Sequence, residues 1–232
     1  MEQNALPPAC TVLMAVHNGE RFLYEAIASI LNQTFTDVEF LIIDDGSTDA
    51  TSSILTSYTD QRIRIITNKT NRGLAASLNI GLKAARGKYI ARMDADDVSF
   101  PDRLERQIAF LERHRKIGVV GTWASVVGKG NKRHIRTYTK PEYIKAALCF
   151  GNQLVHPSVM FRRSLFITND LFYNENFTTS QDYELWCRAT HITQLAALPK
   201  ELILYRAHKN STSTQRSSTQ RHNSRLIRIN YI

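Results

Sequence analysis

The chain has 232 residues, of which 43% are hydrophobic and 22% charged, a composition typical of an ordinary globular protein. This length suits one domain, with or without a small appendage, and such a domain buries a core without disulfide bridges. The net charge of +9 fits a nucleic acid, an anionic membrane, a phosphorylated substrate or merely a basic solvated surface, and the charge alone does not choose among these.

The first half of the sequence alternates apolar runs with amphipathic segments. The apolar runs, typical of buried strands, are residues 11–16, 40–43, 63–67, 89–93 and 117–127. Between them, helices are predicted over residues 22–31, up to about Tyr58 with Ser47 or Thr48 as cap, over residues 74–85 with Gly87 ending the helix, and after Pro101. This alternation predicts an α/β fold with a mostly parallel central sheet and helices on both faces.

After Lys129 the regular alternation ends. Residues 129–140 read as a basic loop, residues 141–150 and 181–189 as helices, and residues 158–161 and 202–205 as short strands. No acidic residue follows Glu201, and residues 211–219 are rich in serine and threonine. We therefore predict one domain over residues 1–214, with halves at 10–127 and 128–214, followed by a basic tail over residues 215–232.

The tail has two interpretations. It is either a disordered, solvated end, or its apolar residues among Arg225 and Arg228 rest on an anionic membrane.

Residues 1–10 lack the features of a signal peptide, and no window reaches the ~18 apolar residues of a membrane span. The three cysteines are far apart and form no CxxC pair, which argues against a zinc site or disulfide framework. We expect a cytoplasmic protein with reduced thiols, either free or peripheral at the inner face of a membrane.

Four polar clusters follow predicted strands: His17-Asn18, Asp44-Asp45, residues 68–73 and residues 94–97. Because ligands of such sheets bind beyond the carboxyl ends of the strands, we expect these clusters to meet at one edge. Asp44 and Asp45 can accept hydrogen bonds from a base or a ribose, or can simply form an Asx turn. Arg72 can pair with a diphosphate, or can be an ordinary surface charge.

Asp94-Ala95-Asp96-Asp97 brings three carboxylates together at a strand end. Their mutual repulsion is relieved by a hard cation, and oxygen ligands favour Mg²⁺ or Mn²⁺. The alternative is an acidic turn that stabilises the positive end of the following helix.

Six further segments match, in order and at the expected intervals, the motifs of a known family: VLMAVHNGERFLYEAIASILNQTF (12–35), EFLIIDDGSTD (39–49), NRGLAASLNIGLKAARGKYIARMDADD (71–97), HPSVMFRR (156–163), SQDYELWCRA (180–189) and YRAHKNSTS (205–213). On these segments the sequence resembles the family 2 glycosyltransferases, which have the GT-A fold. The resemblance implies an inverting, metal-dependent enzyme. Such an enzyme moves a sugar from a nucleotide diphosphate donor, here most simply a UDP-sugar, to a hydroxyl of a saccharide or lipid-linked acceptor.

The resemblance also implies roles for individual residues. Residues 10–127 would bind the nucleotide and residues 128–214 the acceptor. Asp182 would be the general base, and Asp96 and His208 would hold Mn²⁺ or Mg²⁺, although a lone histidine is more often an ordinary structural residue. The nucleotide-sugar would contact Ala15, Val16, Asn18, Asp44, Asp45, Arg72, Asp94 and Ala95.

Two rival functions remain open at this stage. Residues 94–98 also fit the nucleophile motif of haloacid dehalogenase-type phosphatases, but that motif normally follows the first strand and here it follows the fourth. The basic charge permits a non-catalytic nucleic-acid-binding module, although no helix-turn-helix, zinc or RNP-type signature accompanies it, so we expect no specific nucleic-acid partner. The sequence does not indicate the sugar, the acceptor, the linkage or the oligomeric state.

Overall fold

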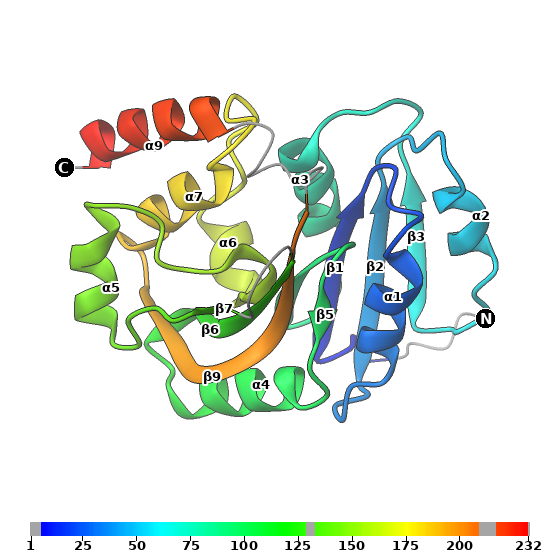
Figure 1. Cartoon of the computed structure of the whole chain (residues 1–232). Coiled ribbons are helices and arrows are strands. Elements are labelled where there is room, and N and C mark those ends of the chain that lie inside the picture. The colour runs from blue at the N-terminus through cyan, green and yellow to red at the C-terminus, as the bar shows by residue number, and fades with distance from the viewer. Residues whose placement is uncertain (1–5, 129–132, 209–216, 232) are drawn as a thin grey trace.

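A nine-stranded mixed sheet forms the centre of the molecule (Figure 1). The computed structural model describes residues 6–128, 133–208 and 217–231. The strands lie in the order β3-β2-β1-β4-β8-β6-β9-β5, and β7 pairs with β6 outside this path. Their bounds are β1 (Cys10–Val16), β2 (Val38–Asp44), β3 (Ile63–Thr67), β4 (Tyr89–Asp94), β5 (Val98–Ser99), β6 (Ile117–Gly128), β7 (Arg133–Ile135), β8 (Met160–Arg162) and β9 (Gln194–Ala207).

The N-terminal strands form the parallel part of the sheet. β1 pairs in parallel with β2 and β4, and β2 pairs in parallel with β3. The residues of β1, β2 and β4 are almost all buried, as expected of continuously apolar strands with both faces covered. The carboxyl ends of these strands meet at one edge, where a ligand of such a sheet binds.

The C-terminal strands close the other side of the sheet. β8 runs antiparallel to β4 and β6, while β6 and β9 pair in parallel over a long, irregular register. β9 curls across the molecule, and its end pairs antiparallel with β5 through Val98 and Leu204 (Figure 1). This pairing returns the chain to the turn after β4, so that residues near position 208 lie beside the acidic turn at Asp94.

Helices cover both faces of the sheet, as predicted. β1 divides its side chains between the faces, with Val12 in one apolar cluster and Leu13 in the other. The first face carries α1 (Leu23–Leu31), α2 (Thr51–Thr56) and α4 (Arg103–Arg113). The second carries α3 (Leu74–Ala84), α5 (Pro141–Leu148), α6 (Arg163–Thr168), α7 (Gln181–Ala189) and α9 (Ser217–Tyr231), and the short 3-10 helix η1 (His156–Ser158) precedes β8.

The predicted caps of two helices are wrong. α2 begins at Thr51, so neither Ser47 nor Thr48 caps it; the hydroxyl of Ser47 instead accepts a hydrogen bond from the backbone N–H of Asn18 at 3.0 Å. α3 ends before Gly87, which serves a different purpose. A Cβ atom there would lie 2.3 Å from a backbone nitrogen of β1, so the close approach of the chain to β1 requires glycine.

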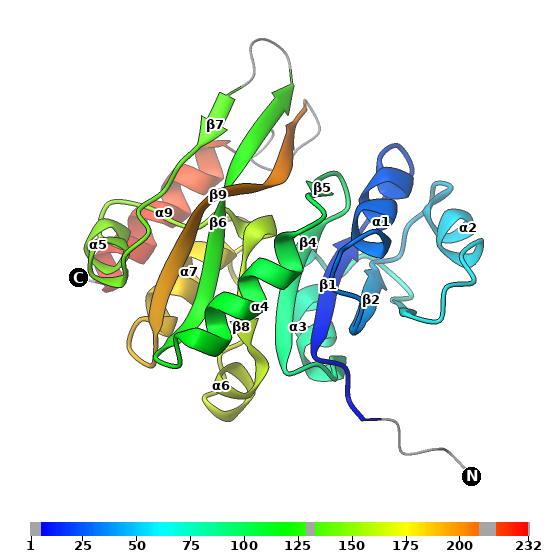
Figure 2. The ribbon, with the colours of Figure 1, turned by 90° about the horizontal axis from the view of Figure 1, so that it is seen from below.

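The prediction of a disordered tail is wrong for its described part. Residues 217–231 form α9, which lies alongside α7 (Figures 1 and 2). Ile227 is 3% exposed within the apolar cluster of the second face, and Tyr231 packs against the same cluster. The helix forms because these two side chains lie on one face of it and find a partner in α7, a contact that tail composition does not reveal.

Candidate active site

A cavity of about 450 Å³ opens at the carboxyl ends of the parallel strands. We call it the strand-end cavity. The four predicted polar clusters do meet here. Its lining includes these predicted site residues: Ala15, Val16, Asn18, Asp45, Arg72, Asp94, Ala95, Asp96 and His208. Asp44 is the one predicted nucleotide-binding residue that is not among its described lining residues.

Asp45 fixes the loop that carries Arg72. The Asp45 side chain is buried, and its Oδ1 accepts hydrogen bonds from the backbone N–H of Arg72 at 2.9 Å and from Asn68 Nδ2 at 2.7 Å. Its Oδ2 accepts from the backbone N–H of Gly73 at 2.9 Å. Gly73 has a φ of 89°, a conformation that favours glycine. The carboxylate therefore holds Arg72 at the cavity wall.

Asp44 and Asn18 shape the neighbouring loops. Asp44 Oδ1 accepts from the backbone N–H of Ser47 at 3.0 Å, and its Oδ2 accepts from the Ser52 hydroxyl at 2.5 Å. Asn18 has a φ of 53°, and its Oδ1 accepts from the backbone N–H of Thr48 at 2.8 Å. These bonds join the loops after β1 and β2. Both oxygens of the Asp44 carboxylate thus hold the segment after β2.

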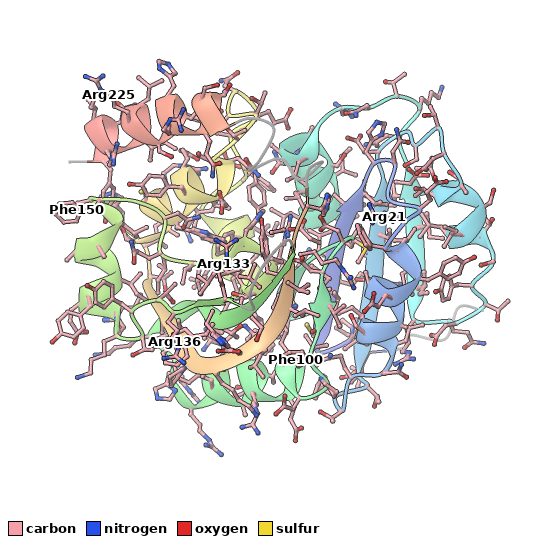
Figure 3. All side chains as sticks on the ribbon, in the orientation of Figure 1. Arg21, Phe100, Arg133, Arg136, Phe150 and Arg225 are labelled. Carbon is pink, nitrogen blue, oxygen red and sulfur yellow. The ribbon has the colours of Figure 1, made fainter. Side chains whose placement is uncertain are left out.

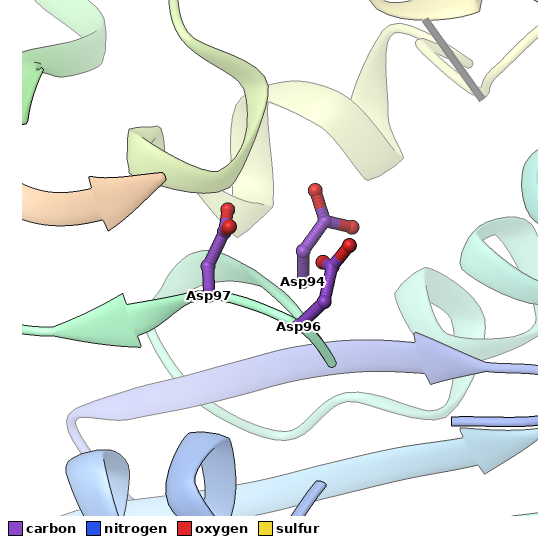
Figure 4. Close-up of side chains that lie close together, drawn as sticks. All are labelled: Asp94, Asp96 and Asp97. Carbon is purple, nitrogen blue, oxygen red and sulfur yellow. The ribbon is translucent and has the colours of Figure 1, made fainter. Parts of the chain in front are cut away.

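Three carboxylates lie together at the turn after β4. Oxygens of Asp94, Asp96 and Asp97 are all within 4.8 Å of one another (Figure 4). Burial, and then the adjacent Asp94 carboxylate, raise the pKa of Asp96, and the same causes raise the pKa of Asp97 well above its ordinary value. His208 Nε2 lies 2.8 Å from Asp96 Oδ2. This set of oxygen and imidazole donors fits a divalent cation, which would relieve the repulsion.

A second cavity of about 410 Å³, the α7 cavity, adjoins the first. Leu74, Asp94 and Asp96 line both cavities. Asp182, in the first turn of α7, lines only the second, and its Oδ2 accepts from Asn152 Nδ2 at 2.7 Å. Burial raises the pKa of the Asp182 carboxyl, against the lowering effect of nearby backbone N–H groups and Asn152. The predicted base and two carboxylates of the acidic turn, Asp94 and Asp96, therefore line the same cavity.

A family model described as "Glycosyl transferase family 2" matches residues 11–169. The chain belongs to glycosyltransferase family 2. An uncharacterized glycosyltransferase of Haemophilus influenzae is 33% identical over 233 residues, which cover 95% of this chain and 72% of the relative. Another, from Methanocaldococcus jannaschii, is 36% identical over 189 residues and is covered over 64% of its length. With the family shown, the phosphatase interpretation of residues 94–98 is set aside.

Solved structures agree with this assignment at the level of the fold. S. aureus TarS 1-349 in complex with UDP-GlcNAc matches with a TM-score of 0.76 and 23% identity, over 87% of this chain and 59% of that one. The mannosyltransferase PcManGT from Pyrobaculum calidifontis, in complex with GDP-Man and Mn²⁺, matches with a TM-score of 0.72 and 17% identity, over 97% and 64% of the two chains. This family 2 chain thus has the GT-A fold and spans about three fifths of these structures. No helix within the described residues combines the length and apolar character needed to cross a membrane.

Sequence reasoning about this family 2 chain missed Arg92 and Asn152, which both line the α7 cavity. Arg92 is 2% exposed, lines the cavity and forms an ion pair with Asp94. The sequence does contain a sign of this ion pair, because Arg92 is a charged residue inside an otherwise apolar strand and a buried charge needs a partner. His156, from the segment HPSVMFRR, also lines this cavity; its Nε2 lies 2.8 Å from the Tyr173 hydroxyl, and burial holds the pKa of His156 well below its usual value. Asn152 carried no motif that could have indicated its bond to Asp182.

Proposed function

We propose that the protein transfers a sugar, with inversion, from a nucleotide diphosphate donor to a hydroxyl of a saccharide or lipid-linked acceptor. The observation that carries this proposal is the pair of adjoining cavities that share Asp94 and Asp96, with Asp45 on one side and Asp182 on the other. A sugar transfer needs such a pair of sites, because the donor sugar must reach a second substrate without leaving the enzyme.

In this proposal the strand-end cavity binds the nucleotide. Ala15, Val16 and Asn18 contact the nucleoside, Asp45 lies at the base, and Arg72 offers its fork of donors to the diphosphate. The complexes of TarS with UDP and UDP-GlcNAc support a UDP-sugar, while the GDP-Man complex of PcManGT keeps a GDP-sugar as the alternative. The shared fold does not determine which donor is bound, so the donor must be identified by binding measurements.

We also propose that Asp96 and His208 hold Mn²⁺ or Mg²⁺. The bound ion would neutralise the charge that develops on the leaving diphosphate. Phe22 packs on His208 with ring centroids 5.4 Å apart, which orients the imidazole toward Asp96. Arg92, buried behind the turn, offsets part of the negative charge through Asp94 and keeps that carboxylate at the junction of the two cavities.

The acceptor occupies the α7 cavity, where Asp182 removes the proton from its hydroxyl. A sugar hydroxyl is too weak an acid to attack unaided, and a positioned base typically contributes ~10²–10⁴-fold to the rate. The raised pKa of Asp182 makes it a stronger base than an exposed carboxylate. Attack from the face opposite the leaving diphosphate inverts the anomeric carbon, so no covalent enzyme intermediate is needed.

A screen of sugar nucleotides with Mn²⁺ or Mg²⁺ tests the proposal. The readout is the release of nucleoside diphosphate, compared with the release of phosphate from simple phosphate esters. We expect one or a few donors to be hydrolysed slowly, only with a divalent ion present. Phosphate release from the esters without hydrolysis of any sugar nucleotide would contradict the proposal.

We also propose that the end of the molecule with α9 and Phe150 contacts a membrane, from which the protein would bind a lipid-linked acceptor. Phe150 is 80% exposed and lies at the same end of the molecule as Arg225 of α9 (Figure 3), and α9 also carries the exposed Leu226 and Ile229. Arg228 donates to the backbone carbonyl of Phe150 at 3.0 Å and so ties the two segments together. Apolar side chains among cations are typical of a contact with anionic lipid.

The test is cosedimentation with anionic liposomes. The double variant Leu226→Ser/Ile229→Ser should bind less than the wild type, while neutral liposomes should bind neither protein. Point variants are needed because a truncation would also remove Ile227 from the core. Equal binding of both proteins to anionic liposomes would contradict a membrane contact at α9.

A further inference from the structure

The turn before Asp182 has a backbone conformation that its own sequence does not favour. Ser180 has a φ of 61° and a ψ of 16°, in the left-handed region. This region is unfavourable for any residue with a Cβ atom and persists only where surrounding contacts enforce it. Ser180 immediately precedes α7, and its side chain makes no capping bond to that helix. The conformation of this turn sets the direction in which the first turn of α7, and with it Asp182, leaves the loop.

Hydrogen bonds from α9 hold this turn. Asn223 Nδ2 donates to the backbone carbonyl of Thr179 at 3.0 Å and to the Thr179 hydroxyl at 3.1 Å. The Ser180 hydroxyl lies 3.2 Å from the Ser224 hydroxyl and donates to the backbone carbonyl of Gln220 at 3.4 Å. Thr179 and Ser180 are buried and Asn223 and Ser224 are half-buried, so these bonds are partly shielded from water. α9 therefore contacts both residues that precede α7 through specific polar groups.

The far end of α9 is anchored independently. Ile227 is buried in the core, and the Tyr231 hydroxyl lies 3.2 Å from the Thr190 hydroxyl just after α7. Gln220 and Ser224 of α9 thus contact the residue before α7, Tyr231 at the end of α9 contacts the residue after α7, and the two helices run in the same direction (Figure 1). Removal of a single polar contact at Asn223 should therefore leave α9 docked while releasing the turn.

We infer that Asn223 and Ser224 are positioning residues for Asp182. They hold Ser180 in its left-handed conformation, so that the first turn of α7 presents the Asp182 carboxylate to the α7 cavity. The inference rests on the proposed role of Asp182 as the base and adds that the C-terminal helix belongs to the catalytic apparatus. Gln220, one turn earlier on α9, lines the same cavity, so this helix also forms part of the acceptor wall.

The test compares Asn223→Ala with Asn230→Ala, the same change at an exposed site on the same helix. Amide hydrogen exchange of Glu184 is measured first, because it needs no substrate. The backbone N–H of Glu184 donates to the Ser180 carbonyl, so it reports on the turn directly. We expect Asn223→Ala to increase exchange at this amide by about tenfold or more and Asn230→Ala to leave it unchanged. Equal exchange in the two variants would overturn the inference whatever the activity of the protein.

Kinetics then separate positioning from general packing. Asn223→Ala should lower kcat for transfer by roughly 10- to 100-fold, since small misplacements of a catalytic group have effects of this size, while KM for the donor stays the same. Ser180→Gly removes the strain, because glycine adopts left-handed conformations freely. In the Ser180→Gly background, we expect the Asn223→Ala change to lower kcat by about threefold or less.

The same loss in both backgrounds would mean that Asn223 acts through packing alone, which would contradict the inference. If the wild type shows no transfer with any donor while the exchange results hold, the proposed function fails and the role of α9 in holding the turn stands. The two failures are thus distinguishable.

Discussion

The two cavities share Asp94 and Asp96 but are built in different ways. The strand-end cavity is formed mostly by loops that follow successive parallel strands, and hydrogen bonds such as Asp45 to Arg72 join one such loop to the next. The α7 cavity gathers Asn152, Asp182 and Gln220 from segments that are separated by long stretches of chain. The first design follows from the parallel sheet itself, whereas the second depends on tertiary contacts. The cavity proposed to bind the donor thus follows from the sheet, and the cavity proposed to bind the acceptor depends on contacts between distant segments.

The largest effect is expected where the two cavities meet. Asp96→Ala should abolish the gain in donor affinity that Mn²⁺ provides and lower transfer by about 10³-fold, since it removes a proposed ligand of the ion. Titration of UDP with and without Mn²⁺ measures this gain. Asp37→Ala, at an exposed site, serves as the control. An Asp96→Ala protein that still binds UDP more tightly with Mn²⁺ would show that the ion is held elsewhere.

Arg92 stabilises the folded protein through its ion pair with Asp94, a residue that lines both cavities. Arg92→Met should lower the free energy of unfolding of the metal-free protein by about 3 kcal/mol, because Asp94 loses its buried partner beside two other carboxylates. The Asp94 side chain is 27% exposed, so the loss should fall at the lower end for such pairs. Urea unfolding measures it. Arg106→Met breaks an exposed pair and should cost about 0.5 kcal/mol or less; similar losses in both variants would refute a special role for Arg92.

Asp45→Asn should affect the strand-end cavity alone. The hydrogen bonds from Arg72, Gly73 and Asn68 reach both carboxylate oxygens of Asp45. An asparagine side chain has only one accepting oxygen, so the loop that carries Arg72 should loosen. We expect KM for the donor to rise roughly 10- to 100-fold with little change in kcat. Steady-state kinetics over a range of donor concentrations separate the two constants. A fall in kcat at unchanged KM would contradict a role of Asp45 in donor binding.

Asn152→Ala should affect the α7 cavity alone, and mainly at low pH. The pKa of Asp182 is raised by burial, so transfer should increase with pH as this carboxyl loses its proton. Asn152 donates to the charged form and thereby lowers the pKa of Asp182. Without it, the rising limb of the rate profile should move to higher pH, while donor binding stays constant. A shift of the rising limb to lower pH would contradict the effect that we assign to Asn152 on the pKa of Asp182.

The difference between the cavities also explains what the sequence could predict. The α/β fold, the parallel strands and the residues around the strand-end cavity follow from apolar runs and the polar residues after them, as with Asp45 after β2. Asp44 shows the limit of that rule, because pattern alone does not say which of two adjacent carboxylates lines the cavity. Asn152, Gln220 and the docking of α9 depend on side chains that meet only in the folded chain, and no local period encodes such contacts.

The central claim is that Asp182 acts on the acceptor and not on the donor, and Asp182→Asn tests it most directly. Donor affinity and its dependence on Mn²⁺ are measured together with the rate of transfer. Asp170→Asn is the control, since it is exposed and its φ of 52° suits asparagine. We predict that Asp182→Asn leaves donor binding within about twofold and lowers transfer by about 10²–10⁴-fold. Transfer at the wild-type rate, or a loss of donor binding equal to the loss of transfer, would contradict the account.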